Sequence, residues 1–533
     1  MSASALATFS VLILLLPLTG AVVAGGLGRW LRDRSHWASM VGVGGAAMVS
    51  FVVLRHVLGV DADHRHLHVV LYQWISTGVE ASWFNVEVLI DPLTAIMLVT
   101  VTFISLLVVI YSRDYMREHG RAEPGYERFF AFLALFVFSM CALVLAGNFL
   151  LLYLGWELVG LCSYLLIGFY YKRPSAAAAA KKAFLVNRIG DFGFGLGILL
   201  IYMTFGRLDY PGVFEMVEQG VTATGQALPE GRLAIIALML LCGAVGKSAQ
   251  LPLYVWLPDA MEGPSPVSAL IHAATMVTAG VYMVARCGAI FAASPAVMMV
   301  VAIIGAATAL FAATIALAQF DMKRILAYST ISQLGYMFLG LGVYAAGSAV
   351  FHLFTHAFFK ALLFLSAGSV MHAMGGVIDL RKFGGLRRVL PWTYRLCLIG
   401  ALALAGFPFL SGFWSKDEII HHAFAANFWL GLVGLLTAVL TAFYTFRMIF
   451  KAFWGDERIP EGVHAHESGR WMLLPMGVLA VGALLAGYFN VPGDRIGHFL
   501  DPVLHPFHAA HAAMAEGAGH AVAVQGFWGE YGL

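Results

Sequence analysis

Long apolar stretches recur along almost the whole chain, and they constrain its fold more than any other feature. Of 533 residues, 60% are hydrophobic and only 12% are charged, against the roughly 25% that is usual in soluble domains. About 20 helical residues cross the hydrocarbon core of a bilayer. The sequence therefore predicts an all-α polytopic membrane protein with about 14 transmembrane helices, near residues 5–28, 38–57, 87–111, 129–146, 148–170, 183–205, 233–258, 264–290, 297–319, 324–343, 347–371, 394–421, 428–450 and 471–489.

Charge and cysteine content exclude several classes of protein. A net charge of +2 offers no basic excess for binding nucleic acid. The five cysteines stand singly inside apolar runs, which argues against a disulfide framework or an iron–sulfur site. No positive charge precedes the first apolar stretch, so we expect a retained first helix rather than a cleaved signal peptide.

The distribution of Lys and Arg orients the expected helices. Cytoplasmic loops carry the excess of positive charge. Twenty-one of the 32 basic residues lie in the connections after odd-numbered helices. The pattern therefore predicts that both termini lie outside the cytoplasm. Six basic residues lie in the other connections: Arg55, Arg65, Arg207, Arg232, Arg286 and Arg495.

The five remaining basic residues are candidates for function. Insertion of an ionisable group at membrane depth costs at least about 2.5 kcal/mol, so such groups are usually functional. All except Arg395, near the start of its span, fall within hydrophobic segments. The five are Arg188, Lys247, Lys360, Arg395 and Lys416.

Two of the expected spans contain internal breaks. Pro252 and Pro258 interrupt the span that holds Lys247, and a Gly-Phe-Pro-Phe-Leu-Ser-Gly run interrupts the span that holds Lys416. These spans are the seventh and the twelfth. An offset of five inverts the direction of the chain, which favours two inverted five-helix repeats with an ion site at their interface. The alternative is two ordinary proline kinks.

A lone carboxylate and two lysines form the first candidate group. Glu157 has no other charge nearby in its span. We expect it to pair with Lys247 or Lys416 and to tune the lysine's affinity for a proton. Two alternatives remain open: a neutral, hydrogen-bonded Glu157, and a Lys416 that reaches the membrane interface beside Asp417 and Glu418.

Histidines form the second candidate group. His352, His356 and Lys360 are spaced four apart, so they lie along one helix face and could relay protons. His272 would add a link from a neighbouring helix. Isolated buried histidines are more often ordinary core residues.

Other polar groups carry weaker signals. Asp191 and Arg188 are expected to form an ion pair within one helix. Gly193, Gly195 and Gly197 follow no strand, so they favour close helix packing over dinucleotide binding. Solvated surface, rather than metal binding, is expected for two histidine groups: His64, His66 and His68, and His464, His466, His498, His505, His508, His511 and His520.

Several motifs together resemble a known family. They include LLYLGWELVGLCSYLLIGFYY, NRIGDFGF, GKSAQLPLYVWLPDAMEGPSPVSALIHAATMVTAGVY, DMKRILAYSTISQLGYM, FHLFTHAFFKALLFLSAGSVMHAM and GFPFLSGFWSKDEI, in this order between about residues 87 and 450. The chain resembles the L-type (subunit 5) membrane chains of proton-pumping NADH:quinone oxidoreductase, respiratory complex I. NRIGDFGF and FWSKDEI favour this type over the sister M and N chains.

The resemblance implies a site and a division of the chain. Glu157 and Lys247 would be the coupling pair, His272, His352, His356 and Lys360 the central relay, and Lys416 the terminal lysine, with Asp191, Lys323 and Asp417 in support. Residues 1–128 would hold helices 1–3 and an outer loop, 129–290 the first repeat, 291–453 the second, and 454–533 helix 14 with a polar His- and Ala-rich tail. Family members usually continue with further helices after this point.

The resemblance also implies partners and a location. The chain itself would hold no redox centre, no cofactor and no metal, because NADH, FMN, iron–sulfur clusters and quinone would bind elsewhere in the complex. Its partners would be the M- and N-type chains in a bacterial inner membrane, with both termini periplasmic. Three alternatives remain: an Mrp-type cation/proton antiporter subunit using H⁺ or Na⁺, the membrane subunit of an inorganic-carbon uptake system, and a structural scaffold.

Overall fold

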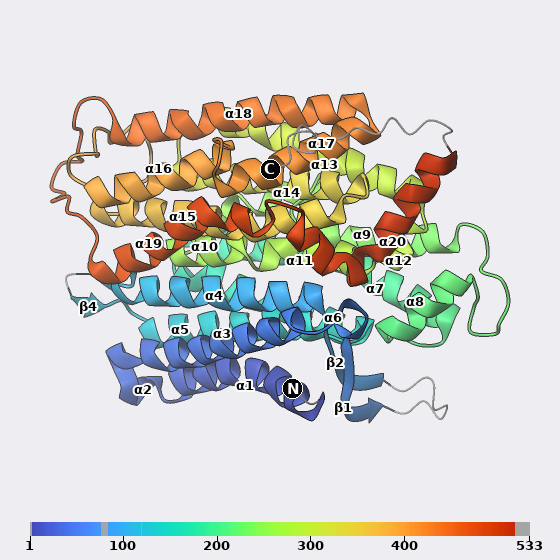
Figure 1. Ribbon diagram of the computed structural model, residues 1–533. Coiled ribbons are helices and arrows are strands. Elements are labelled where there is room, and N and C mark those ends of the chain that lie inside the picture. The colour runs from blue at the N-terminus through green and yellow to red at the C-terminus, as the bar shows by residue number, and fades with distance from the viewer. Residues whose placement is uncertain (1–2, 76–83, 119, 518–533) are drawn as a thin grey trace.

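The chain forms one bundle of helices lying alongside one another (Figure 1). The structure is a computed structural model, and it describes residues 3–75, 84–118 and 120–517. Eleven segments of the described chain are long and apolar enough to cross a membrane. They lie in α1 (Ala3–Gly26), α3 (His36–Leu58), α4 (Pro92–Tyr115), α5 (Tyr126–Leu145), α6 (Phe149–Ile167), α7 (Pro174–Phe205), α10 (Ser265–Ala273) with α11 (Ala279–Arg286), α13 (Pro295–Ala318), α15 (Ala346–Ala373), α18 (Phe428–Phe453) and α19 (Arg470–Leu485).

The other three expected spans are also present as helices. They are α9 (Arg232–Lys247), α14 (Met322–Gly342), and α16 (Pro391–Ala405) with α17 (Ser411–Ala426). The first and third are interrupted, and α14 is rich in polar residues, which explains why length and apolarity alone do not select them. All fourteen expected segments therefore correspond to continuous or broken helices.

Shorter elements connect these helices. The short helices are α2 (Gly28–Leu31), α8 (Tyr210–Gln219) and α12 (Gly288–Ala292), and the longer α20 (Arg495–Gly517) follows α19. The strands are β1 (Leu67–Ile75), β2 (Phe84–Ile90), β3 (Arg117–Glu118) and β4 (Arg121–Ala122), paired as two antiparallel hairpins. The 3₁₀ turns are η1 (Arg32–Arg34), η2 (Ala62–His64), η4 (Gly168–Tyr170), η5 (Leu253–Trp256), η6 (Asp259–Glu262), η7 (Met276–Thr278) and η8 (Ala486–Phe489).

Polar residues at helix starts fix where several spans begin. The side chain of Asp91 accepts a hydrogen bond from the backbone N–H of Thr94 at the start of α4, at 2.9 Å. Asn148 caps α6 and Asp321 caps α14 in the same way. A capping side chain satisfies a backbone donor that the helix leaves free. These caps place the starts of α4, α6 and α14.

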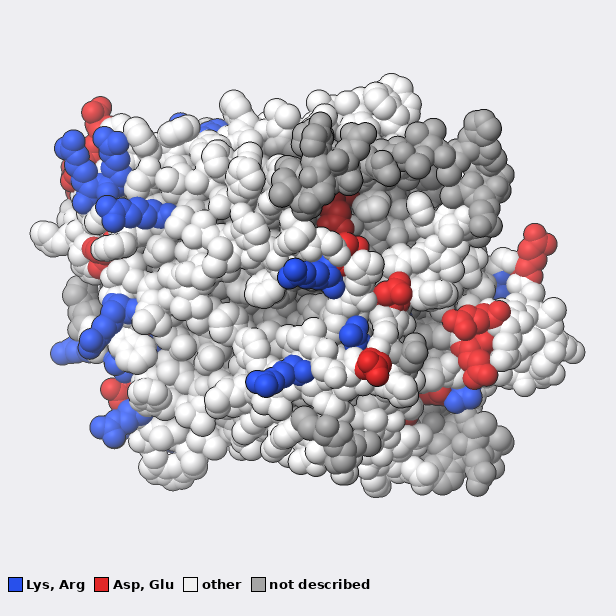
Figure 2. Space-filling model, viewed as in Figure 1, with Lys and Arg blue, Asp and Glu red and all other residues white. Residues whose placement is uncertain are grey.

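The two ends of the bundle differ in character. One end carries α2 and β4, and the other carries β1, β2, α8 and α20 (Figure 1). Lys and Arg gather at the end with α2 and β4, whereas Asp and Glu are prominent near α8 and α20 (Figure 2). The helices thus run between a basic end and a more acidic end, as the loop charges predict.

Close helix contacts explain the glycines of α7. A Cβ at Gly190 would lie 2.7 Å from the carbonyl oxygen of Cys242, and one at Gly193 would lie 2.6 Å from the Cβ of Cys242. A Cβ at Gly195 would make only ordinary contact, 3.6 Å from the Tyr153 hydroxyl oxygen. Close packing of α7 on α9 therefore requires Gly190 and Gly193, and the packing interpretation of the glycines holds there but not at Gly195.

Two expectations about elements were wrong. The third span starts at Pro92 rather than at residue 87, because Phe84–Ile90 forms strand β2 and pairs with β1. The tail after the last span is not only polar surface: residues 495–517 form helix α20. Its apolar face buries Phe499, Leu500 and Phe507, and these residues recur at helical spacing.

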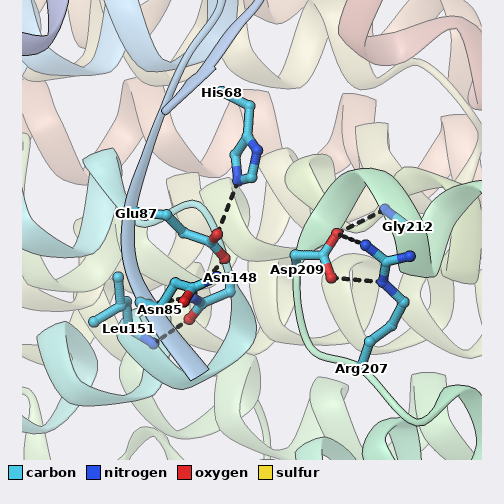
Figure 3. A network of polar contacts seen from close by, with 8 residues as sticks. All are labelled: His68, Asn85, Glu87, Asn148, Leu151, Arg207, Asp209 and Gly212. Carbon is cyan, nitrogen blue, oxygen red and sulfur yellow. Dashed lines mark hydrogen bonds and ion pairs between the residues drawn. The ribbon is translucent and has the colours of Figure 1, made fainter. Parts of the chain in front are cut away.

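A polar network anchors the β1–β2 hairpin to α6 (Figure 3). Nε2 of His68 lies 3.2 Å from Oε2 of Glu87. The amide of Asn148, which caps α6, donates to Oε1 of Glu87 at 2.6 Å and to the carbonyl of Asn85 at 2.9 Å. Burial of Glu87 is thus offset by a histidine and an amide, so the hairpin and α6 are held together by polar contacts.

Candidate functional site

The candidate site begins where α9 ends inside the bundle. Lys247 is the last residue of α9, and the chain continues through the turns η5 and η6. The indole N–H of Trp256 donates to the carbonyl of Gly246 at 3.0 Å, and the hydroxyl of Ser248 donates to that of Val277 at 2.8 Å. The Trp256 indole therefore satisfies a carbonyl at the end of α9, and Ser248 ties the break to η7.

A buried ion pair holds the ammonium of Lys247. Its Nζ lies 3.4 Å from Oδ2 of Asp191 on α7, and both side chains are 1% exposed. The indole N–H of Trp156 on α6 donates to the other carboxylate oxygen of Asp191 at 2.7 Å. A buried charge needs such partners. Lys247 thus sits where α6, α7 and the break of α9 meet.

Glu157 belongs to a neighbouring pair. Its carboxylate is bonded to the guanidinium of Arg188 on α7, and both side chains are partly exposed on the surface of this chain. The expected Glu157–lysine pair and the expected Arg188–Asp191 pair are therefore both wrong. Arg188 on α7 pairs with Glu157 on α6. Asp191, one turn further along α7, pairs with Lys247.

Lys323 and His272 lie further into the bundle. Nζ of Lys323 donates to the carbonyls of Met261 and Gly263 at 2.6 and 2.7 Å. His272 is fully buried on α10, and neither of its ring nitrogens has a hydrogen-bond partner in the described chain. Buried polar atoms without protein partners often bind water. Both ring nitrogens of His272 are therefore free of protein partners in the part of the chain that the structure describes.

The stripe on α15 is buried along its whole length. His352, His356 and Lys360 are each fully buried, and the two imidazole centroids are 6.3 Å apart. Nδ1 of His352 lies 2.9 Å from the hydroxyl of Ser415, and Nδ1 of His356 lies 3.1 Å from the carbonyl of Ala273. Four-residue spacing on a helix places these groups on one face, as expected.

The partners of Lys360 are neutral oxygens. Its ammonium contacts the hydroxyl of Ser329 and donates to the carbonyl of Leu326 at 3.3 Å, both on α14. Among the described residues it has no carboxylate contact. A proton on Lys360 is therefore held by dipoles rather than by an opposite charge.

Lys416 lies at the second break. Gly406 ends α16 with φ +80°, a left-handed conformation that suits glycine, and α17 begins at Ser411. Nζ of Lys416 donates to the carbonyl of Leu404 at 2.6 Å, and it lies 5.6 Å from the centroid of the Tyr336 ring. The ammonium occupies the negative end of α16. Lys416 is 3% exposed, so its ammonium is enclosed by the bundle rather than exposed on the bundle surface.

These groups lie at the two helix breaks and on α10, α14 and α15, which pack against one another. Lysine and histidine side chains both bind and release protons. Asp191 and Lys247 mark one break and Lys416 marks the other, with His352 and Lys360 on α15 between them. The arrangement places several groups that can bind a proton inside the bundle.

Comparison with known proteins identifies the family. The family described as "NADH:quinone oxidoreductase/Mrp antiporter, TM" matches residues 146–441, and "NADH-Ubiquinone oxidoreductase (complex I), chain 5 N-terminus" matches residues 74–130. NADH-quinone oxidoreductase subunit L of Rhodobacter capsulatus is 46% identical over 516 residues, which cover 92% of this chain and 71% of the relative. The chain belongs to the subunit L family. Subunit L of Mycobacterium tuberculosis H37Rv is 45% identical, covering 92% of this chain and 77% of the relative.

Solved structures agree with this fold. A chain of the Mrp complex from Dietzia sp. DQ12-45-1b superposes with a TM-score of 0.76 at 28% identity, over 94% of this chain. This chain spans about half of that one, 52%. A chain of the archaeal membrane-bound sulfane sulfur reductase superposes with a TM-score of 0.80 at 22% identity, covering 94% of this chain and 99% of that one. The antiporter-like fold of the subunit L family is therefore shown.

Some groups around the subunit L site escaped the sequence analysis. Gln333 and Ser415 both contact the imidazole of His352, at 3.2 and 2.9 Å. Arg286, counted among outer loop residues, is buried and bonded to Asp91 and Thr94. Asp417 is exposed on α17, and no hydrogen bond of its side chain is seen in the described chain. A neutral residue such as Gln333 does not stand out in an apolar sequence as a buried charge does, so its contact with His352 could not be predicted.

The two histidine groups are scattered in the structure. His64 and His66 precede β1, and only His68 lies on the strand. His464 and His466 lie in the loop before α19, whereas His498, His505, His508 and His511 lie on α20, and His520 lies outside the described residues. No cluster of His, Cys, Asp or Glu suited to a metal ion occurs within residues 3–75, 84–118 and 120–517.

Proposed function

We propose that this chain is the proton-translocating membrane-arm subunit of an NADH:quinone oxidoreductase, coupling electron transfer from NADH to quinone to proton pumping. Two observations support the proposal: 46% identity to a subunit L over 92% of the chain, and buried lysines at both helix breaks. As part of that enzyme complex it acts as a translocase, and its partners are the other membrane-arm subunits.

The proton route follows the buried groups in order. A change of charge near Glu157 and Arg188 alters the field at Asp191 and Lys247. Lys247 then passes a proton by way of Lys323 and His272 to Lys360, and the imidazoles on α15 carry it toward Lys416. Each step breaks one N–H bond and forms another, so no electrons move within this chain. Protons are taken up on the basic, cytoplasmic side and released on the periplasmic side of an inner membrane, where both termini lie.

The same route fits two structural repeats. Residues 129–290 form one repeat around the break of α9, and residues 291–453 form the second around the break between α16 and α17. Residues 1–128 pack beside them, and residues 454–533 follow. NADH, FMN, iron–sulfur clusters and quinone bind elsewhere in the complex, so the residues of this chain bind and move protons only.

Cation/proton antiport is the second candidate, favoured by the likeness to the Mrp complex chain. Inside-out vesicles containing the assembled complex distinguish the two functions. NADH addition should acidify the lumen, and this acidification should be the same in Na⁺ and K⁺ media. A pH change driven by a Na⁺ gradient without NADH, and none driven by NADH, would instead identify an antiporter.

A further inference from the structure

Glu418 is a partly buried carboxylate that the route above does not use. It lies on α17, two residues beyond Lys416. The hydroxyl of Ser348 on α15 donates to its Oε1 at 2.9 Å, and the amide of Asn490 donates to its Oε2 at 3.3 Å. Within the described chain it forms no ion pair, since its bonded partners are a hydroxyl and an amide. A carboxylate in such a place can be protonated and deprotonated without breaking an ion pair.

Ser348 bonds to Glu418 and lies one helical turn before the histidine stripe. Ser348 precedes His352 by four residues, as His352 precedes His356 and His356 precedes Lys360. The four side chains therefore share one face of α15. At 1.5 Å per residue, Ser348 lies about 6 Å beyond His352 along the axis. Glu418 thus meets the stripe at its last position.

This end of the stripe faces the acidic side of the bundle. Asn490 lies between α19 and α20, and α20 belongs to the end of the bundle with β1, β2 and α8 (Figure 1). Asp494, in the same connection, is exposed and lies within electrostatic range of Glu418. A proton leaving Glu418 therefore has a short way to the surface on the side opposite the basic loops.

Of the two carboxylates that follow Lys416, only Glu418 faces the stripe. Asp417 is exposed on α17, whereas Glu418 is held by groups from α15 and from the connection after α19. Successive residues of a helix point about 100° apart, so the two side chains cannot share these contacts. The resemblance to the family singles out Lys416, whereas the hydrogen bonds to Ser348 and Asn490 single out Glu418.

We propose that Glu418 is the carboxylate that receives each proton at the outer end of the α15 stripe and releases it from the membrane. An N–H bond of the His352 imidazolium breaks and an O–H bond forms on Glu418. The Ser348 hydroxyl, one helical turn from His352, gives its proton to Oε1 of Glu418 as it accepts the proton that leaves the imidazolium. That O–H bond then breaks to external water, which restores the carboxylate. One proton moves outward and no redox partner is needed. The inference rests on the proposed function.

A structural alternative must be separated from this role. Glu418 joins α15, α17 and the α19–α20 connection, so its removal could simply loosen the bundle. Glu418→Gln keeps an oxygen that can accept the Ser348 hydrogen bond but cannot carry the proton. Glu418→Asp keeps the titratable group on a shorter stem. Glu215→Gln, on the exposed outer helix α8, is the matched control.

The test measures NADH-driven proton uptake into inside-out vesicles, together with the amount of assembled complex. Glu418→Gln should assemble normally and lower the pumping rate on the order of tenfold or more, the typical contribution of a positioned acid–base group. Glu418→Asp should recover part of the rate and shift its pH profile, and Glu215→Gln should match the unsubstituted chain. Normal pumping by Glu418→Gln, or equal losses of assembly in both Glu418 variants, would overturn the inference. Failure of the proposed function would be separate, since the unsubstituted chain would then not pump with NADH.

Discussion

The position of the Lys247 ammonium depends on Gly160, a residue that has no side chain. A Cβ on Gly160 of α6 would lie 2.7 Å from Nζ of Lys247, closer than van der Waals contact allows. The absence of that Cβ lets the ammonium approach Asp191, which lies 3.4 Å away. The geometry of the pair therefore depends on a neighbour that carries no charge.

Gly160→Ala should reduce pumping without unfolding the chain. The flexible end of Lys247 can move away from the new methyl group, but it then leaves Asp191. Displacement of an acting group by about 1 Å can lower a rate up to about a hundredfold, so we expect a loss between about tenfold and a hundredfold in NADH-driven pumping. Gly195→Ala, whose Cβ would make only ordinary contact with Tyr153, should change nothing. Equal pumping by both variants would refute this account of Gly160.

The contact between His68 and Glu87 should depend on pH. The hydrogen bond to Glu87 raises the pKa of His68 above its usual value of 6.5, although burial opposes this. The pair therefore stabilises the hairpin fully below about pH 6.5, and its contribution is lost as the pH rises through the raised pKa. The protection factors of the β1 and β2 amides, which are corrected for the intrinsic pH dependence of exchange, should fall across that range, and His68→Gln should abolish this fall. A flat profile in the unsubstituted chain would contradict the prediction.

Helix packing between α7 and α9 places Asp191 opposite Lys247. Gly190 lies one residue before Asp191, and a Cβ there would meet the backbone of Cys242 at 2.7 Å and Cα of Gly246 at 3.1 Å. Backbone atoms cannot move aside as the end of a lysine can. The two helices must therefore separate to admit any side chain at this position.

Gly190→Ala should destabilise the bundle by about 1–3 kcal/mol, as overpacking usually does. The midpoint of thermal unfolding of the detergent-solubilised complex should fall, while Gly195→Ala on the same helix should keep it. A Gly190→Ala complex as stable as the unsubstituted one would show that α7 and α9 are not packed this closely.

Elements differ in how well the sequence predicts them. Apolar length locates helices such as α13 and α18, and Pro252 and Pro408 locate the two breaks. The hairpin strand β2 was hidden because its apolar residues run directly into α4. Helix α20 was hidden because its histidines and prolines suggested a polar tail, although Phe499 and Phe507 recur on its buried face. Local composition identifies an element only when its neighbours do not mask it.

Ion pairs were less predictable than positions. The scarcity of charge marks Lys247, Lys360 and Lys416 as buried, and all three are. Their partners depend on helix contacts far apart in sequence, such as Lys247 with Asp191, 56 residues away. Spacing within one helix pointed to Arg188 and Asp191, but packing against α6 and α9 assigns each a different partner. Burial follows from composition, whereas pairing requires the tertiary structure.

At the scale of the whole molecule, few charges lie inside the bundle and many lie at its ends. Lys and Arg concentrate at one end (Figure 2), and this asymmetry sets the direction of transport in the proposed function. Buried lysines lie at both helix breaks and on α15. In the proposed function, protons driven by NADH oxidation pass between these buried groups.

The most direct measurement is NADH-driven proton uptake by inside-out vesicles that carry Lys247→Met. The account predicts an assembled complex whose pumping rate falls on the order of tenfold or more. Lys382→Met, which removes an exposed lysine of the basic end, should pump like the unsubstituted chain. Undiminished pumping by an assembled Lys247→Met complex would contradict the account.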